Sequence, residues 1–449
     1  MTLQGKHIAV VGAGVSGLAA AYRLRKQGAT VTVFEKSGEV GGRTLSLRQD
    51  GFTIDLGALM MMPTYQNVIS LSREMGIEQH LVKMRPTMSI VRDGVHHDID
   101  MQHPLRSLLS MRLISTGSAL KLLKLLPLVV RNWSLFHYEN MGDLAPFDHE
   151  TLHDFCQREF NDEIEDYLAS PLIRAGSLTS TREAPFGDWL WQAVGFRYPT
   201  VLQWDQGMDF FARSLAREQD IRLHVEVTAV RNEGGRARID YRNGGNGSDG
   251  SDSSAVFDAC LLAVPTPVSH AIAPSVTPQQ KEFFANLKPV PMTSLHLGLR
   301  EKPKSKASVI LIPEKESKDV MMILLDHNKV AGRAPDGKGI VTIWTTKEWT
   351  AAHAHDSDAA IQAELCRLAE PFVGRLDDKI ELAHVQRRDF VVAQTYPGFF
   401  TRLRDYMATR DVDQPLFFCG DFSAEGIEGA VTCALNVSRD VANYLKQQN

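Results

Sequence analysis

The stretch IAVVGAGVSGLAAAYRLRKQGATVTVFE at residues 8–35 decides the fold class. An apolar run of four residues comes first, glycines follow at 12, 14 and 17, and apolar residues then recur at helical spacing up to Gly28. Residues 31–35 have the composition of a second short buried strand. A helix that joins two neighbouring strands makes them parallel, so the sequence predicts an α/β fold built on a parallel sheet.

The glycine-rich turn is expected to bind a dinucleotide. Gly12 permits a tight turn, Gly14 lets a pyrophosphate approach the backbone, and Gly17 allows close packing of the helix. Val15 and Ser16 lie between them at the predicted helix N-terminus, where free amides suit anionic oxygens. Strand, turn and helix occur in the order that this kind of site requires.

Glu35 ends the second predicted strand, where a carboxylate can accept hydrogen bonds from ribose hydroxyls. The turn and this acid do not separate NAD from FAD, because both cofactors carry the same ADP moiety. The residues that follow decide between them. Gly41 and Gly42 let the chain pass close to a cofactor, and Arg43 can place a guanidinium on a pyrophosphate.

The whole stretch VVGAGVSGLAAAYRLRKQGATVTVFEKSGEVGGRT at residues 10–44 closely resembles the N-terminus of the flavin amine oxidase superfamily. That superfamily includes amine oxidases, protoporphyrinogen oxidases and phytoene-type desaturases. The resemblance implies a Rossmann-like FAD-binding domain with an inserted α+β substrate domain. No cysteine lies between Cys366 and Cys419, where covalent members place theirs, so FAD is expected to bind non-covalently.

Three later segments extend the resemblance. Residues 52–58 are similar to a segment that runs alongside the isoalloxazine, residues 225–230 to the adenine-side strand, and residues 417–431 to the closing motif. In that last motif a carboxylate, here Asp421, meets the cofactor. The implied cofactor-binding residues are Gly12, Gly14, Val15, Ser16, Gly17, Glu35, Gly42, Arg43, Gly57, Ala58, Leu59, Met60, Val227, Gly420, Asp421, Gly429, Ala430 and Val431.

The chain is predicted to divide into two interleaved domains. We expect the FAD-binding domain at residues 1–85, 205–287 and 385–449, and the substrate domain at residues 86–204 and 288–384. The region from 86 to 204 is predicted to be helix-rich. Residues 245–250, GNGSDG, also match the glycine pattern, but no apolar helix follows, so we expect an exposed loop there.

Departures from the superfamily pattern concern the chemistry. Amine oxidases usually carry an aromatic residue where this chain has Gly426, and a lysine in a strand comparable to residues 292–299. His296 lies in that strand, as a candidate catalytic residue that takes a proton or as a structural histidine with satisfied hydrogen bonds. Tyr396 is a second candidate for catalysis. Met61, Met62 and Phe399 are predicted to contact the substrate.

These features favour removal of two hydrogens from an apolar small molecule, with a hydride passing to the flavin N5. Oxidation of a C–N bond by a flavin amine oxidase is the alternative, and a redox-neutral flavin isomerase is a third. Oxygen or a quinone is the expected electron acceptor.

Composition limits the remaining classes. The chain has 449 residues and a net charge of −5, which argues against general nucleic-acid binding. Its five dispersed cysteines favour neither a disulfide framework nor a metal site. No long uncharged apolar run and no leader pattern occurs, so a cytoplasmic location is expected. Residues 120–136 mix apolar and basic side chains, and are predicted either to contact a membrane peripherally or to cover a substrate channel.

Overall fold

The predicted strand–turn–helix unit forms at the N-terminus of the computed structural model, which describes residues 2–84, 87–100, 107, 113–195, 200–244, 251–273 and 277–448. Strand β1 (His7–Val11) pairs in parallel with β2 (Thr30–Phe34), and helix α1 (Val15–Lys26) connects them. The helix buries Leu18, Leu24 and its alanines, which form its apolar face, and the chain reverses at Gly28 with φ +95°.

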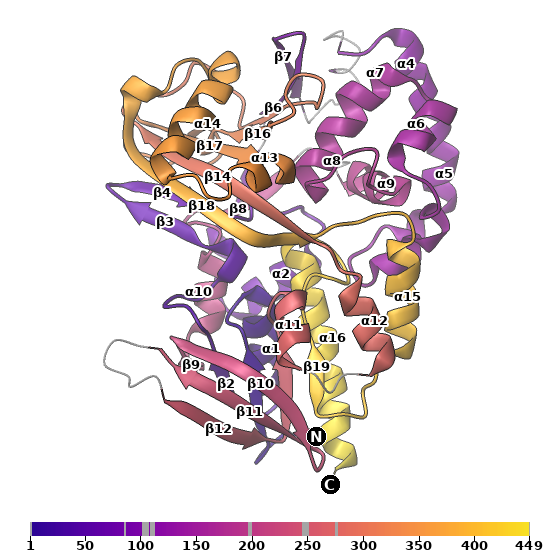
Figure 1. Ribbon diagram of the computed structural model, residues 1–449, viewed down its shortest axis with the longest axis vertical. Coiled ribbons are helices and arrows are strands. Elements are labelled where there is room, and N and C mark those ends of the chain that lie inside the picture. The colour runs from indigo at the N-terminus through magenta and orange to yellow at the C-terminus, as the bar shows by residue number, and fades with distance from the viewer. Residues whose placement is uncertain are drawn as a thin grey trace.

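A five-stranded parallel sheet is the framework of the lower lobe in Figure 1, in the order β19-β13-β1-β2-β9. Three of its strands come from distant parts of the chain: β9 (Asp220–Arg222), β13 (Ala259–Leu262) and β19 (Leu416–Phe418). Helices α1 and α16 (Gly426–Gln447) pack against one another beside this sheet. The α/β fold predicted from the first 35 residues is therefore confirmed.

Further elements of the lower lobe surround that sheet. They are the hairpin β3 (Ser46–Gln49) and β4 (Phe52–Asp55), the antiparallel β10 (Val225–Glu233), β11 (Arg236–Asn243) and β12 (Asp252–Phe257), and the helices α2 (Gln66–Glu74), α10 (Phe210–Ala216), α11 (Thr266–Ile272), α12 (Pro278–Ala285) and α15 (Phe399–Thr409). The predicted adenine-side strand at residues 225–230 lies in β10, and the chain turns between β9 and β10 with His224 at φ +56°. The second match to the glycine pattern, at residues 245–250, lies outside the described residues.

A seven-stranded sheet forms the upper left of Figure 1, in the order β18-β14-β17-β16-β15-β6-β7. Its strands are β6 (Thr87–Arg92), β7 (Val95–Asp100), β14 (Pro289–Leu299), β15 (Val309–Leu311), β16 (Val320–Leu324), β17 (Gly339–Thr345) and β18 (Ile380–Ala393). Helices α13 (Lys347–Ala352) and α14 (Asp358–Val373) lie beside it. The expected domain boundary at residue 384 falls inside β18, which stays paired with β14 up to Ala393.

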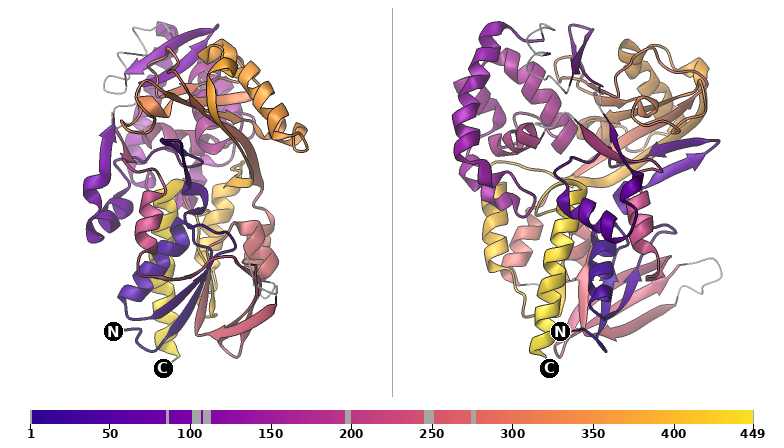
Figure 2. Two further views of the ribbon diagram at one scale, coloured as in Figure 1. Left: turned by 90° about the vertical axis from the view of Figure 1, so that its left-hand side faces the viewer. Right: turned by 180° about the vertical axis from the view of Figure 1, so that it is seen from behind.

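Helices form the upper right of Figure 1. They are α4 (Thr116–Lys121), α5 (Leu125–Arg131), α6 (Leu152–Glu159), α7 (Asp162–Ile164), α8 (Ser170–Ser177) and α9 (Phe186–Gly195). The expected helix-rich region is thus present, but it begins with strands β6 and β7 and ends after β8 (Val201–Trp204), which pairs with β5 (Leu81–Met84). Figure 2 shows that both chain ends lie at the far end of the lower lobe.

Candidate cofactor and substrate site

The glycine turn after β1 has one open side. A Cβ atom on Gly12 would lie 2.7 Å from the carbonyl oxygen of Ala263, and one on Gly17 would lie 2.1 Å from the carbonyl oxygen of Gly12. A Cβ on Gly14, by contrast, would meet no atom within 4 Å. Gly12 and Gly17 are therefore required by packing within the protein, whereas Gly14 leaves space beside the N-terminus of α1 for a group outside the chain.

The second glycine segment lies directly against this turn. Gly14 and Gly41 form a parallel bridge, and the Gly41 amide donates to the Ala13 carbonyl at 2.9 Å. A Cβ on Gly42 would lie 3.5 Å from the Cα of Gly14. Two glycine-rich backbones thus form one continuous surface at the carboxyl end of the parallel sheet, where α/β proteins bind their ligands.

Glu35 lies beside the turn, at the end of β2. One of its carboxylate oxygens accepts a hydrogen bond from the Ala13 amide at 2.7 Å, and the other accepts from the amide and hydroxyl of Ser37 at 2.9 and 2.8 Å. The amide of Val225 donates to the Glu35 carbonyl at 2.9 Å, so β10 starts here, with Val227 buried two residues further on. The structure therefore brings together Glu35 and Val227, both predicted to contact the adenosine end.

Arg43 and Asp421 are separated by 378 residues in the sequence and form a bidentate ion pair with two N–O distances of 2.8 Å. Arg43 also donates to the Val391 carbonyl at 2.6 Å, and its own carbonyl accepts from the Ala58 amide at 3.1 Å. A Cβ on Gly57 would lie 2.0 Å from that carbonyl oxygen. The predicted cofactor segments from both ends of the chain thus meet at Arg43, whose fork is engaged by Asp421 and Val391.

The closing motif packs onto the first turn. Gly420 and Asp421 follow β19, and the Sγ of neighbouring Cys419 lies 2.7 Å from the Ser16 hydroxyl. Ala430 and Val431 are buried in the first turns of α16. A Cβ on Gly429 would lie 1.8 Å from the Ala424 carbonyl, so only glycine permits this close approach.

Apolar side chains continue the site from Arg43 into the upper lobe. Leu59 and Met60 follow Ala58 and pack with Val391 and Val392 of β18 against one apolar cluster. All four are partly exposed. The buried members of the cluster are Met88, Ile90, Ile99, Leu113, Ile114, Tyr167, Leu178, Val290, Met292, Val309, Leu311, Met321, Met322, Leu324 and Trp344. We call Leu59, Met60, Val391 and Val392 the apolar wall.

Met61 and Met62, the two methionines predicted to contact substrate, do not belong to the apolar wall. Met61 is 1% exposed, and its backbone pairs with Leu202 in both directions. Its side chain belongs to the core of the lower lobe, so the structure offers no surface there for a substrate. Met62 is partly exposed and packs, together with Met60 of the wall, against a small cluster of Met84, Val201 and Val330.

His296 has no free ring nitrogen. It is fully buried in β14, where Nε2 lies 2.9 Å from the Ser294 hydroxyl and Nδ1 lies 3.1 Å from the Thr342 hydroxyl. Burial, together with the nearby His384 ring, lowers the pKa of His296 to about 3. This geometry matches the structural histidine of the two predicted roles, and it argues against a proton acceptor.

Tyr396 and Phe399 lie in the lower lobe, packed with the core that contains the five-stranded sheet. The Tyr396 hydroxyl donates to the Asn286 carbonyl at 3.0 Å, and Phe399 is 5% exposed at the start of α15. Neither residue contacts the cluster behind the apolar wall. The structure therefore does not place them where substrate was predicted to bind.

Two carboxyl groups that meet near the start of α16, the buried Asp188 and the partly exposed Glu425, had no sequence signal. The Ser177 hydroxyl lies 2.8 Å from Asp188 and 3.1 Å from Glu425. Asp188 also accepts from Thr395 at 2.5 Å and Gln192 at 2.9 Å. The Ser177 hydroxyl can donate its one proton to only one of the two carboxylates. Both contacts are hydrogen bonds when Ser177 donates to Asp188 and a protonated Glu425 donates to Ser177. Burial and the charge of Asp188 raise the pKa of Glu425 well above its usual range.

Tyr65 compensates for the missing side chain at Gly426. A Cβ on Gly426 would lie 2.9 Å from the Tyr65 hydroxyl oxygen. Tyr65 packs edge-on against Tyr138, with 5.2 Å between ring centroids, and Tyr138 packs in the same way on Trp191 at 4.9 Å. An aromatic side chain from another segment therefore occupies the space that the sequence left empty at residue 426.

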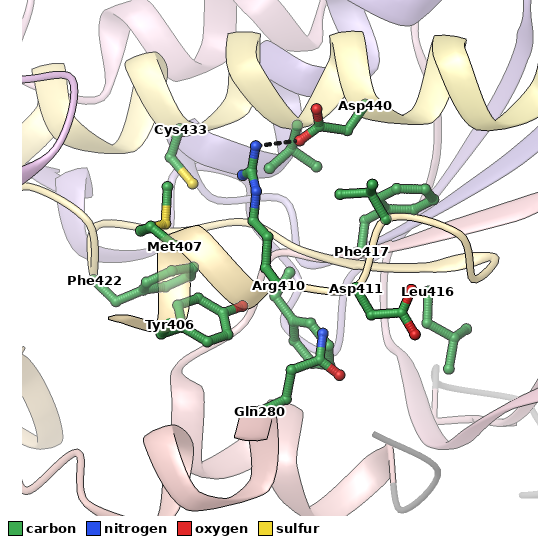
Figure 3. Close-up of a pocket in the computed structure, with 13 residues that line it drawn as sticks. Gln280, Tyr406, Met407, Arg410, Asp411, Leu416, Phe417, Phe422, Cys433 and Asp440 are labelled. Carbon is green, nitrogen blue, oxygen red and sulfur yellow. Dashed lines mark ion pairs between the residues drawn. The ribbon is translucent and has the colours of Figure 1, made fainter. Parts of the chain in front are cut away.

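The pocket in Figure 3 is distinct from these features. It is lined by side chains of α12, α15, β19 and α16, and Arg410 forms an ion pair with Asp440 across it at 2.8 Å. Its volume of 20 Å³ is enough for about one water molecule. None of its lining residues was predicted to bind cofactor or substrate, and we assign it no function.

These elements define the class: an α/β protein with a dinucleotide turn, a terminal acid and a second glycine segment. The profile of the flavin-containing amine oxidoreductase family matches residues 15–442. The chain belongs to this family. The resemblance found in the sequence is confirmed, and the open side of the turn at Gly14 fits the pyrophosphate of FAD.

Individual relatives match over shorter stretches. Mitochondrial protoporphyrinogen oxidase of Nicotiana tabacum is 36% identical over 170 residues, which cover 37% of this chain and 32% of that protein. A 4,4'-diapophytoene desaturase of Staphylococcus aureus (strain MRSA252) is 56% identical over 66 residues, or 14% of this chain and 13% of that enzyme. These matched segments span about a third or less of the curated relatives.

The solved structure of wild-type putrescine oxidase bound to putrescine is similar over the whole fold. Its TM-score is 0.74 at 19% identity, and the alignment covers 99% of this chain and 100% of that one. At this identity the likeness defines the fold, and the fold alone.

Proposed function

We propose that this protein oxidises an apolar, amine-free small molecule by removing two hydrogens, and that oxygen or a quinone then takes the electrons. The apolar wall carries this proposal. Arg43 bonds to Val391 at 2.6 Å on one side and to Ala58 at 3.1 Å on the other, so accessible apolar side chains begin directly beside the cofactor segments.

FAD supplies the redox chemistry when it is bound, as a hydride acceptor at N5. The residues of the chain bind and orient it. The glycine turn and the N-terminus of α1 offer amides to the pyrophosphate, Glu35 offers a carboxylate to the ribose, and the Arg43–Asp421 pair meets the pyrophosphate and ribityl part of the cofactor. We assign the cofactor to the lobe of the five-stranded sheet and the substrate to the other lobe, with the apolar wall between them.

The apolar wall positions the substrate and excludes water from it. Leu59 and Met60 present flexible apolar surface, and Met side chains adapt to bulky uncharged molecules. Because His296 is engaged at both nitrogens, the released proton passes to a group other than this histidine.

The proposal places the protein in the cytoplasm, in peripheral contact with a membrane.

Amine oxidation is the second candidate, and Tyr65 is the observation in its favour. Its hydroxyl fills the space beside Gly426, so an aromatic side chain is available near the start of α16. Glu425 lies next to Gly426, and burial together with the charge of Asp188 favours the uncharged form of its carboxyl group, which attracts an ammonium group less than a carboxylate does. We therefore rank an amine-free substrate first.

Anaerobic mixing separates these functions. The proposal predicts that an amine-free cyclic or polyene compound bleaches the bound flavin and that primary and secondary amines do not. Bleaching by amines alone would establish the second candidate. Turnover of the compound without net bleaching would identify a redox-neutral isomerase instead.

A further inference from the structure

Exposed apolar side chains gather on one helical segment at the edge of the molecule. Among the described residues, nine large hydrophobic side chains are exposed, and five of them lie between residues 120 and 133. We call these five the apolar stripe: Leu120 (61% exposed), Leu123 (55%), Leu126 (59%), Val130 (74%) and Trp133 (53%). Their spacing of three or four residues places them along one face of the segment that contains α4 and α5.

The opposite face of this segment is partly buried. Leu122, Leu125, Leu128 and Val129 pack against the core of α6, α8 and α9. The segment is thus apolar on both sides but covered on only one. Clustered apolar side chains that remain exposed to this extent commonly mark a surface that binds protein or lipid.

The charge on this segment indicates the partner. Residues 116–136 contain Lys121, Lys124 and Arg131 and no Asp or Glu, although the whole chain has a net charge of −5. Lys124 is paired with Glu159 at 3.1 Å, whereas Lys121 donates to the Phe160 carbonyl, which leaves its charge uncompensated by a carboxylate. Arg131 is exposed. Apolar residues with a tryptophan and flanking basic residues are the composition that binds anionic lipid surfaces.

The shape of the patch favours a bilayer over a second copy of the chain. Figures 1 and 2 show α4 and α5 at the outer edge of the helical region, and no other helix or strand of the described residues lies on their outer side. The apolar stripe is one helix wide, whereas a stable protein dimer buries about 800 Å² on each partner. None of the described helices is long and apolar enough to cross a bilayer.

We propose that the apolar stripe docks the protein on an anionic lipid bilayer, with Leu120, Leu123, Leu126, Val130 and Trp133 inserted among the lipids and Lys121 and Arg131 at the headgroups. Leu122, on the inner face, packs against both the helical core and the cluster behind the apolar wall. A substrate dissolved in the bilayer would therefore meet the protein next to its own binding site. This last link rests on the proposed function, whereas the docking itself does not.

Sedimentation with lipid vesicles tests the docking without any substrate. We expect the FAD-loaded protein to bind vesicles of phosphatidylcholine and phosphatidylglycerol, and to bind pure phosphatidylcholine more weakly. The double variant Leu123→Glu, Leu126→Glu should lower binding to the mixed vesicles by about tenfold or more. Val256→Glu is the matched control, because Val256 is 41% exposed on β12 and outside the stripe.

Retained FAD and an unchanged Tm show that each variant is folded. Wild-type protein that stays in the supernatant with both kinds of vesicle would overturn the proposal. If light scattering shows that the wild-type protein is a dimer and the double variant is a monomer, the proposal is overturned in favour of a second copy of the chain as the partner. A failure of the proposed oxidation would appear as an unbleached flavin and would leave the vesicle result standing.

Discussion

Gly14 and Gly17 stand three residues apart in the same turn, and the structure predicts opposite effects for the same substitution. Gly14 has φ −74° and ψ 174°, a conformation that any residue adopts, and a Cβ there meets no atom within 4 Å. In Gly14→Ala the reduced entropy of the unfolded chain stabilises by about 0.4–1 kcal/mol. Replacing glycine at a helix N-cap costs a similar amount, so the apoprotein should keep its Tm.

The cost of Gly14→Ala should appear in FAD binding. The added methyl occupies the open side of the turn and moves the pyrophosphate away from backbone amides. One charge-assisted hydrogen bond contributes about 1.5–3 kcal/mol, so its loss raises the Kd of FAD about tenfold to a hundredfold. Gly17→Ala instead places a Cβ 2.1 Å from the Gly12 carbonyl, which should lower the Tm of the apoprotein by several degrees.

Titration of the apoprotein with FAD and a thermal melt of each variant give both numbers. The reasoning is refuted if Gly14→Ala binds FAD with the wild-type Kd, because the open side of the turn would then not face the cofactor. Equal losses of Tm in the two variants would also contradict it.

Further predictions concern the buried polar groups and the cofactor. Acid precipitation should release FAD into the supernatant, and yellow colour in the pellet would indicate a covalent link. His296→Ala should lower the Tm, because Ser294 and Thr342 lose a partner, which costs about 1–3 kcal/mol; a flavin reduction rate that falls about a hundredfold would restore its catalytic role. The pKa of Glu425 is higher in the folded state than its unfolded value of about 4.5. The stability that this group contributes is therefore present below about pH 4.5 and is lost as the pH rises through the folded-state pKa. Glu425→Gln should therefore have the Tm of the wild type near pH 4 and a higher Tm than the wild type near pH 8. An equal Tm difference at both pH values would rule out a protonated Glu425.

The cofactor half of the site was predictable from sequence because its signals are local. The close packing contact of Gly17 with Gly12 and the position of Glu35 beside the turn depend on residues within one βαβ unit, whereas the space at Gly12 is also limited by Ala263, which follows β13. The meeting of Arg43 and Asp421 depends on the whole fold, yet both residues belong to short motifs that the family resemblance had already indicated.

The substrate half was less predictable, because exposure depends on neighbours far away in the chain. The sequence placed His296 in a strand, but it could not show that Thr342 of β17 would engage the ring. Met61 follows the two wall residues in sequence and turns into the core through its pairing with Leu202. Glu425 and Asp188 meet through Ser177, and no pattern in the sequence marks that contact.

Flavin reduction under anaerobic conditions, followed by absorbance in a stopped-flow instrument, tests the central claim most directly. The FAD-loaded protein is mixed in parallel with amine-free cyclic and polyene compounds and with primary and secondary amines of matched size. The account predicts rapid bleaching by at least one amine-free compound and none by the amines. Rapid bleaching by an amine, with the flavin left oxidised by every amine-free compound, would contradict it.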